Sequence, residues 1–265
     1  MQSRNGVSAP SAATPLAGRL HGALGGFLER LFPADCRGCE RPLAGAPNAW
    51  FCAVCWGDLE VIDDSLCDHC GLALARGAVD AGDLPARRCG NCIKTPPAFD
   101  RLRTLGLYQG VLARAVQLLK YRERTGLARA LVERADLGVL PPEFHEADRV
   151  VPVPLYPARL RTRGFNQSTR IARALGGRLE VPVQETALAR VRSTRTQVGL
   201  SRKERVSNVA HAFQVVSATP LRGRSVILVD DVVTTGATVS ACVRALKRAG
   251  VKQVTVWALA RQHIR

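Results

Sequence analysis

Two adjacent carboxylates, Asp230 and Asp231, follow the apolar run 226–229 and precede a turn of threonine and glycine. The apolar run predicts a buried parallel strand that ends at the two acids. A helix is predicted at 237–250, so the turn places backbone N–H groups at a helix N-terminus, where anions bind readily. The residues expected to hold a phosphate there are Thr234, Thr235, Gly236, Ala237 and Thr238. Carboxylates beside a phosphate site suit the hydroxyls of a sugar phosphate.

Two common nucleotide-binding patterns do not occur in the sequence, which narrows the chemistry. A nucleotide hydrolase needs a G-x-x-x-x-G-K-[ST] loop, and a dinucleotide-binding fold needs G-x-G-x-x-G; neither string is present. An ordinary strand, turn and helix with a solvated pair of aspartates stays open as the alternative to a sugar-phosphate site.

Eight of the nine cysteines form four C-x-x-C pairs, and they predict two structural zinc sites. The pairs are Cys36/Cys39, Cys52/Cys55, Cys67/Cys70 and Cys89/Cys92. Each C-x-x-C turn aims two thiolates at one metal, so two turns complete a tetrahedron and leave no position for a catalytic water. Sequential and interleaved pairing both remain open, and an iron–sulfur cluster is the weaker alternative. The ninth cysteine, Cys242, is expected to be a small core residue.

The net charge of +16 is concentrated in one part of the 265-residue chain. Residues 1–98 carry 9 Lys+Arg and 10 Asp+Glu, whereas residues 99–265 carry 29 and 12. The basic part suits an anionic ligand, either a polyphosphate or a nucleic acid backbone. No run of 18 apolar residues occurs, so no membrane span is expected and the cytoplasm is the default location.

Composition and spacing also predict how the chain is organised. We expect a disordered tail at 1–17, a helix at 20–31 followed by a double zinc ribbon within 18–97, a loop at 76–88, and a second domain at 98–265. In that domain, strands are predicted at 102–108, 149–153, 188–191, 226–231 and 253–259, and helices at 111–121, 127–140, 159–175, 201–211 and 237–250. This alternation predicts an α/β fold with an open parallel sheet and ligands at the carboxyl ends of its strands.

Two basic segments could hold a pyrophosphate. The segment 151–167 supplies Arg159, Arg161 and Arg163, and the segment 190–208 supplies Arg195 and Arg202. Arginine suits this role because its guanidinium contacts phosphate oxygens with two parallel hydrogen bonds. Low apolar content predicts that 190–208 is a mobile loop that closes over the ligand. A solvated helix face and a plain surface linker are the respective alternatives.

The string from Asp230 to Thr238 resembles the signature of type I phosphoribosyltransferases, and the whole set of motifs resembles the ComF family of bacterial competence proteins. The matching pieces are the C-x-x-C pairs with Phe51 and Trp56, Leu119-Lys120-Tyr121, Val151-Pro-Val-Pro154, Arg161-Thr-Arg-Gly-Phe-Asn-Gln167, Thr196-Gln197 with Leu200, Arg205, Asn208 and Ala212-Phe213. The resemblance covers the chain from about Phe32 onward. A full double ribbon is a departure, because some relatives keep one four-cysteine set.

The resemblance implies a phosphoribosyltransferase-like domain at 98–265 behind an N-terminal zinc module. It implies that Asp230 and Asp231 hold the ribose hydroxyls of phosphoribosyl pyrophosphate with Mg²⁺, and that the following loop holds the 5′-phosphate. It further implies a role in the use of incoming single-stranded DNA during natural transformation, with a competence helicase or uptake protein as a partner. It does not establish pentosyltransferase catalysis. A non-catalytic single-strand-binding or scaffold protein on the same fold is the alternative.

Overall fold

The computed structural model describes residues 35–43, 50–59, 66–74, 87–121, 126–193, 202–209 and 211–262. The chain divides into two compact units, one ending at Cys55 and the other beginning at Trp56. The predicted tail at 1–17, the predicted helix at 20–31 and most of the predicted loop at 76–88 lie outside the described residues. The domain bounds that the sequence suggests stay a prediction.

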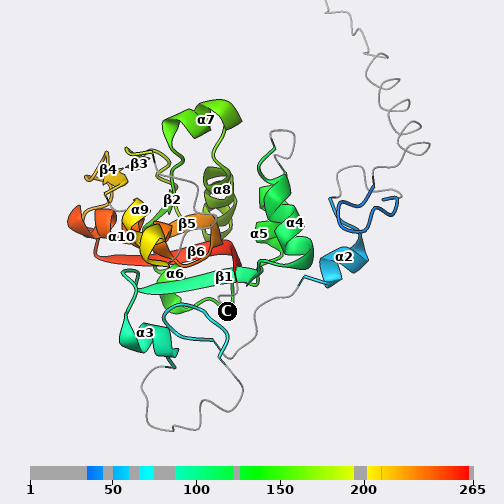
Figure 1. Cartoon of the computed structure of the whole chain (residues 1–265), viewed down its shortest axis with the longest axis horizontal. Helices are drawn as coiled ribbons and strands as arrows, with labels where there is room; N and C mark the ends of the chain where they lie inside the picture. Colours follow the sequence, from blue (N-terminus) through cyan, green and yellow to red (C-terminus); the bar gives the residue numbers. More distant parts are fainter. Residues whose placement is uncertain are drawn as a thin grey trace, which may run out of the picture. The chain divides into compact units, whose positions relative to one another are not determined.

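The second unit contains a four-stranded parallel sheet in the order β1-β6-β5-β2 (Figure 1). Its strands are β1 (Arg101–Leu107), β2 (Arg149–Pro152), β5 (Ser225–Val233) and β6 (Gln253–Arg261). The central strands β5 and β6 are buried along most of their length, which explains their largely apolar sequences. The predicted open parallel α/β sheet is confirmed.

Helices α4 (Gly110–Leu118), α8 (Gln167–Leu179) and α10 (Ala237–Arg248) pack directly on this sheet. The second unit also contains α5 (Leu127–Glu133), α6 (Pro142–His145) and α9 (Arg202–Val209). Helix α8 packs on β2 and β5 and against α5, whereas α10 packs on β5 and β6 and against α9. None of the helices in the described ranges is long and apolar enough to cross a membrane.

The single helix predicted at 159–175 is wrong, because two helices occupy this stretch. Helix α7 (Pro157–Arg163) ends at Gly164, whose positive φ of 77° terminates it. Helix α8 then begins after Asn166, whose side chain accepts a hydrogen bond from Ser168 N. Helix α7 buries none of its residues. Its arginines are therefore separated from the packed helix α8 by a turn.

Two other predicted elements differ from the structure. The predicted helix at 127–140 ends early, at Glu133, and Pro142 starts α6 because proline is well suited to a first helical turn. The strand predicted at 188–191 forms as β3 (Leu188–Arg190), but it lies outside the parallel sheet. It pairs antiparallel with β4 (Phe213–Val215), a strand that the sequence analysis missed because three residues carry little periodicity.

The two cysteine ribbons begin with the same backbone turn. In each, the N–H of the residue after the C-x-x-C motif donates to the carbonyl of the first cysteine at 2.8 Å. That residue has positive φ in both turns, 62° at Glu40 and 63° at Gly71. Short helices follow, α2 (Ala53–Gly57) in the first ribbon and α3 (Gly90–Lys94) in the second. The chain therefore forms one metal-binding turn twice.

The second ribbon packs tightly on the edge of the sheet. Leu102 N in β1 donates to His69 O at 2.8 Å, and His69 Nε2 donates to Phe99 O at 2.6 Å. A Cβ on Gly71 would lie 2.7 Å from Leu102 O, closer than real Cβ contacts come. This close approach requires glycine at Gly71, since Glu40 adopts the same φ in the first ribbon with a side chain.

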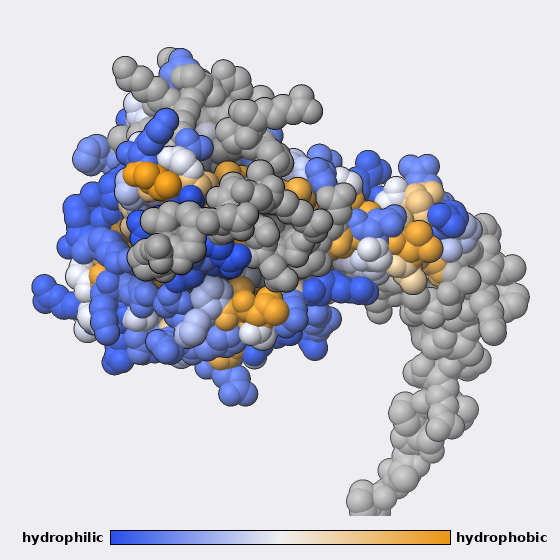
Figure 2. Space-filling view, turned by 90° about the horizontal axis from the view of Figure 1, so that it is seen from below, coloured by the Kyte–Doolittle hydropathy of each residue, from blue (hydrophilic) through white to orange (hydrophobic). Residues whose placement is uncertain are grey.

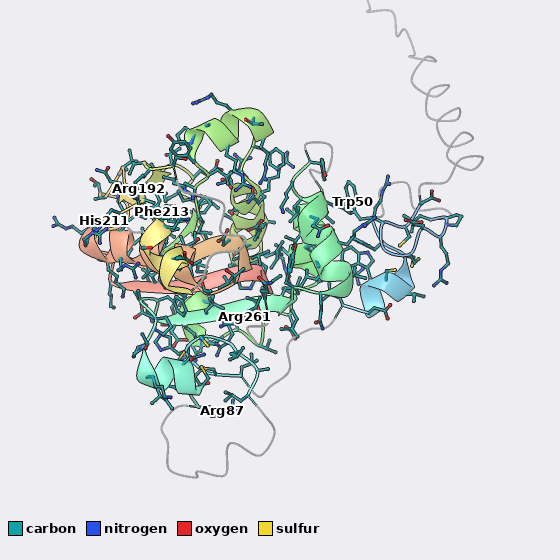
Figure 3. All side chains as sticks on the ribbon, viewed as in Figure 1. Trp50, Arg87, Arg192, His211, Phe213 and Arg261 are labelled. Atoms are coloured by element: carbon teal, nitrogen blue, oxygen red, sulfur yellow. The ribbon has the colours of Figure 1, made fainter. Side chains whose placement is uncertain are left out.

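Arg261 connects the end of β6 to the same ribbon (Figure 3). Its guanidinium, 7% exposed, donates to Cys70 O and lies 3.7 Å from Cys70 Sγ. All four cysteines of this ribbon belong to the buried core that also contains the apolar face of α10. By contrast, hydrophilic residues cover most of the described surface on the face in Figure 2.

Candidate functional site

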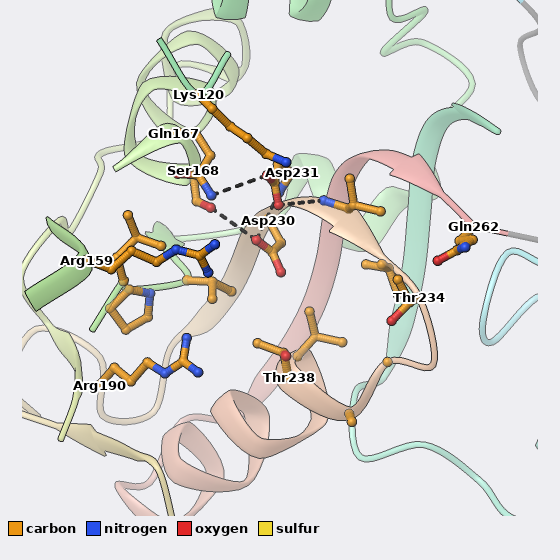
Figure 4. Close-up of a pocket in the computed structure, with 18 of the residues that line it drawn as sticks. Lys120, Arg159, Gln167, Ser168, Arg190, Asp230, Asp231, Thr234, Thr238 and Gln262 are labelled. Carbon is orange, nitrogen blue, oxygen red and sulfur yellow. Dashed lines mark hydrogen bonds between the residues drawn. The ribbon is translucent and has the colours of Figure 1, made fainter. Parts of the chain in front are cut away.

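A pocket of about 390 Å³ lies at the carboxyl ends of the four parallel strands (Figure 4). Each strand is followed by residues that line the pocket, namely Tyr108, Val153 to Leu155, Thr234 and Gln262. This is the edge at which open α/β sheets bind ligands. We call this cavity the strand-end pocket.

The acidic pair lies in the wall of the strand-end pocket, and the start of α8 positions both carboxylates. Ser168 Oγ donates to Asp230 Oδ1 at 3.1 Å, and Gln167 Nε2 donates to Asp231 Oδ2 at 3.2 Å (Figure 4). The backbone N–H of Val232 donates to Asp231 Oδ1 at 2.8 Å. Both carboxylates are therefore held in fixed orientations before any ligand arrives.

The two carboxyl groups differ in their surroundings. Asp230 is 8% exposed, and burial raises its pKa well above the ordinary value, with the adjacent charge of Asp231 adding to the shift. Asp231 is less buried and faces the pocket. A metal ion or a ribose hydroxyl at this site would offset the cost of keeping Asp230 ionised.

The predicted phosphate loop borders the same pocket. Thr234, Gly236, Ala237 and Thr238 line it, whereas Thr235 does not and lines a second cavity instead. Gly236 caps α10 with a positive φ of 77°, which permits the sharp turn from strand to helix. The N-terminus of this 12-residue helix therefore points toward the pocket and favours an anion there.

Three arginines line the same strand-end pocket as the acids: Arg159, Arg163 and Arg190. Burial, followed by the nearby charge of Arg159, lowers the pKa of Arg163 from its ordinary value, whereas the charge of Asp231 opposes the shift. Of the other predicted basic residues, Arg161 does not line the pocket, Arg195 lies outside the described residues, and the side chain of Arg202 is not among those described.

Several pocket residues were given no role by the sequence analysis. They are Tyr108, Lys120, Gln167, Ser168, Arg190 and Gln262. Lys120, Gln167 and Arg190 stood within motifs or segments that had been singled out, but no spacing rule tied them to the acids. Tyr108 and Gln262 follow β1 and β6 directly, so a sheet order known in advance would have placed both at the site.

Asn166 explains why α8 starts at the right place to orient the acids. Its Nδ2 donates to Val153 O at 2.9 Å, and its Oδ1 accepts from Ser168 N at 3.1 Å. Val153 N in turn donates to Val229 O at 2.9 Å, beside the start of the acidic pair. The end of β2, the start of α8 and the end of β5 are thereby joined by hydrogen bonds.

The cysteines group sequentially, which resolves the pairing that the sequence left open. Cys36, Cys39, Cys52 and Cys55 form one set, and Cys67, Cys70, Cys89 and Cys92 form the other, each with its sulfur atoms within 4.8 Å of one another. Neighbouring sulfurs lie 3.7 Å apart between Cys39 and Cys52 and between Cys70 and Cys89. Tetrahedral zinc with bonds of about 2.3 Å requires sulfur separations of about 3.8 Å. Both sets fit zinc as a structural ion.

The surroundings of the first cysteine in each set lower the pKa of its thiol. Burial opposes ionisation of Cys36, but backbone N–H groups of Cys39, Cys52 and Gly38 bring its pKa to about 6. The Cys70 thiol, together with backbone N–H groups, lowers the pKa of Cys67 to about 3 despite burial. Metal ligands bind as thiolates, and these contacts stabilise that form at the first cysteine of each set, whereas burial raises the pKa of Cys55 and Cys92 in the same sets.

Comparisons with known proteins agree with this architecture. A family described as double zinc ribbon domain matches residues 27–93, and one described as phosphoribosyl transferase domain matches residues 160–265. Competence protein F of Haemophilus influenzae is 33% identical over 79% of this chain and 96% of its own length. DNA utilization protein YhgH of Escherichia coli K12 is 36% identical over 86% of this chain and 97% of its own. The chain belongs to this ComF and YhgH family.

A third relative, competence protein ComFC of Streptococcus pneumoniae, is 31% identical over 42% of this chain and 47% of its own length. The ribbon match includes all eight paired cysteines, and the phosphoribosyl transferase match includes the acidic pair and its loop. Within the ComF and YhgH family, this chain therefore carries both the metal-binding and the strand-end elements.

Proposed function

We propose that this protein binds phosphoribosyl pyrophosphate, or a related ribose phosphate, with Mg²⁺ in the strand-end pocket. The observation that supports this most strongly is the gathering of two oriented carboxylates, a helix N-terminus and three arginines around one cavity of about 390 Å³. Such a site suits a ligand with hydroxyls in its middle for the carboxylates and a phosphate at each end, one for the helix N-terminus and one for the arginines.

Each part of the pocket has a partner in such a ligand. The 5′-phosphate lies at the loop of Thr234 and Thr238, and the ribose hydroxyls lie at Asp230 and Asp231. The pyrophosphate lies at the arginine wall that includes Arg159, where planar guanidinium groups suit phosphate oxygens. Arg161, Arg195 and Arg202 remain proposals for a loop contact outside the described pocket.

Phosphoribosyl transfer is the reaction that this arrangement could perform. The bond from ribose C1 to a pyrophosphate oxygen breaks, pyrophosphate leaves with the electron pair, and an acceptor nitrogen bonds to C1. Asp230 and Asp231 stabilise the positive charge that develops on the ribose, and the arginines hold the leaving group. Mg²⁺, when bound, supplies charge to stabilise the departing pyrophosphate. The acceptor stays unassigned.

The biological setting that we propose is the use of incoming single-stranded DNA in the cytoplasm. Supporting it are the names of the relatives, competence protein F and DNA utilization protein YhgH, and the positive excess of residues 99–265. A competence helicase or uptake protein is the protein partner that fits such a role.

Calorimetric titration with Mg²⁺ and phosphoribosyl pyrophosphate tests the ligand. We expect micromolar binding by the zinc-loaded protein and a loss of at least tenfold in Asp231→Asn, because a carboxylate that accepts ligand hydroxyls becomes an amide. Asp136→Asn, at an exposed aspartate outside the pocket, is the matched control and should bind normally. Equal affinity in Asp231→Asn with unchanged zinc content would contradict the proposal.

A non-catalytic single-strand-binding role is the second candidate, and the charge distribution favours it. Residues 99–265 hold 29 Lys+Arg against 12 Asp+Glu. This role predicts binding of an oligonucleotide whose affinity falls steeply with salt, since the protein displaces condensed counterions. Binding that does not depend on salt, or none at low salt, would argue against it.

A further inference from the structure

A second cavity, of about 260 Å³, lies on the other side of the phosphate loop. One wall comes from the second ribbon and the segment after it, 91–99, and the other from the loop and the first turns of α10. We call it the loop-back pocket. Its volume lies just below the roughly 300–1,000 Å³ that is typical of ligand sites, which suits one small molecule.

The phosphate loop forms a thin partition between the two pockets. Val233, Gly236 and Ala237 line both cavities. The threonines divide between them, since Thr234 and Thr238 line the strand-end pocket and Thr235 lines the loop-back pocket. The hydroxyl of Thr235 is thus a potential donor to a ligand other than the one at the strand ends.

The lining of the loop-back pocket is apolar at its sides and basic at two points. Pro96, Pro97 and the largely buried Phe99 line its apolar side, and Arg244 and Arg261 provide the charge. No aspartate or glutamate is among the described residues that line it. The pocket therefore suits a partly apolar molecule that carries hydrogen-bond acceptors or a negative group.

The two arginines that line the loop-back pocket differ in burial. We call its buried end, at Arg261, the floor and its exposed end, at Arg244, the mouth. Arg261 is 7% exposed, and its Nε, which is itself buried, has no hydrogen-bond partner among the described residues. Arg244 is exposed and lies one helical turn beyond Ser240, which also lines the cavity. An unpaired buried donor is uncommon in folded proteins and marks a place where a partner is expected.

The charge of the zinc-bound cysteines at the floor determines which end of a ligand points inward. Four thiolates around one Zn²⁺ carry a net charge of −2, which Arg261 offsets only in part. An anionic group is therefore repelled by the floor and attracted by Arg244 at the mouth, while an uncharged flat ring fits against Pro97 and Phe99. A nucleotide meets these requirements, because its flat base carries hydrogen-bond acceptors and its other end carries a phosphate.

We propose that the loop-back pocket binds a single nucleoside monophosphate, either free or as the 5′-phosphorylated end of a DNA strand. The base occupies the floor, and the phosphate lies at the mouth beside Arg244. The proposal does not depend on phosphoribosyl pyrophosphate binding, because it concerns a separate cavity.

Titration of the zinc-loaded full chain with thymidine 5′-monophosphate is the test. Arg244→Ala should weaken binding about tenfold or more, because a charged hydrogen bond to phosphate is lost. Ser240→Phe should abolish it by filling the cavity. Arg248→Ala removes an exposed arginine of the same helix that does not line the pocket, and should leave affinity unchanged. Two bound zinc ions per chain show that each variant is folded.

The strand-end pocket is a competing location for the same probe, and Asp231→Asn and Arg159→Ala distinguish it. Binding that falls in these two variants and not in Arg244→Ala would overturn the proposal, as would the absence of binding at millimolar probe. A decamer of deoxythymidine with and without a 5′-phosphate separates the two sources. If only the phosphorylated decamer competes with thymidine 5′-monophosphate, the ligand is the phosphorylated end of a DNA strand. If neither decamer competes, the ligand is the free nucleotide.

Discussion

Gln167 donates a hydrogen bond from Nε2 to Asp231 Oδ2 over 3.2 Å while its own Oε1 accepts one from Arg163 at 2.6 Å. A single buried amide therefore links an arginine of the basic helix α7 to a carboxylate at the end of β5. A ligand that contacts both ends of this chain would meet groups already oriented toward it.

Replacing Gln167 with alanine should weaken binding of Mg²⁺ and phosphoribosyl pyrophosphate about tenfold or more, because Asp231 loses a charged hydrogen bond of roughly 1.5–3 kcal/mol. Calorimetry measures the change. Gln214→Ala, at an exposed glutamine in β4, should have no effect. Equal affinities for the two variants would show that the link does not position Asp231.

Substitution of Arg159 and of Arg161, which lie two residues apart in α7, should affect ligand binding differently. Arg159 lines the strand-end pocket and Arg161 does not, although both lie on the same short helix. We expect Arg159→Ala to weaken phosphoribosyl pyrophosphate binding about tenfold and Arg161→Ala to change it less than twofold. Similar losses in both would indicate that the helix acts through its net charge alone.

Asp230→Asn should make the ligand-free protein more stable at neutral pH. Burial raises the folded-state pKa of Asp230 above its unfolded value, so the wild type loses stability as pH rises through the folded pKa. The melting temperature of the variant, relative to wild type, should thus increase from acid toward neutral pH. The cysteines are common to both proteins, so their titration cancels in the difference.

Asp148→Asn is the opposite case and serves as the control for pH. The N–H of Ser225 lowers the pKa of Asp148, although burial opposes the shift and Arg224 assists it. Its stabilising effect is therefore present above the unfolded pKa and lost as pH falls through the folded one. Melting temperatures of this variant should fall below those of wild type at neutral pH by a small amount, because the carboxyl group is partly exposed to water.

Gly71→Ala should destabilise the protein by roughly 1–3 kcal/mol, because alanine is strained at positive φ and its Cβ would collide with Leu102 O. Urea unfolding measures this cost. Gly90→Ala is the matched control in the same ribbon, since no atom lies within 4 Å of the added Cβ, and we expect a change within roughly 0.5 kcal/mol. A tolerated Gly71→Ala would mean that the ribbon does not need its close contact with β1.

Native mass spectrometry should find two zinc ions per chain. Cys67→Ser should reduce the count to one, because the second set loses a thiolate that the fold prepares to ionise. Cys242→Ala should retain both ions, since Cys242 belongs to neither set. An unchanged count in Cys67→Ser would contradict the assignment of that set.

Local chemistry made much of this protein predictable from the sequence. The β-branched run before Asp230 and Asp231 predicts a buried strand, and the Thr/Gly turn after it predicts a helix start with an anion site. Both follow from interactions among neighbours in the chain. The C-x-x-C spacing likewise sets where two thiolates point, whatever surrounds them.

Tertiary structure alone decided which distant residues meet. Strand order brings Tyr108 and Gln262 to the pocket that the acidic pair also lines, and the turn at Gly164 ends α7 before Gln167, which begins α8 and reaches Asp231. The grouping of the cysteines and the packing of the second ribbon behind the phosphate loop also depend on contacts between segments far apart in sequence. No local propensity encodes these pairings, because they arise from burying whole elements against one another.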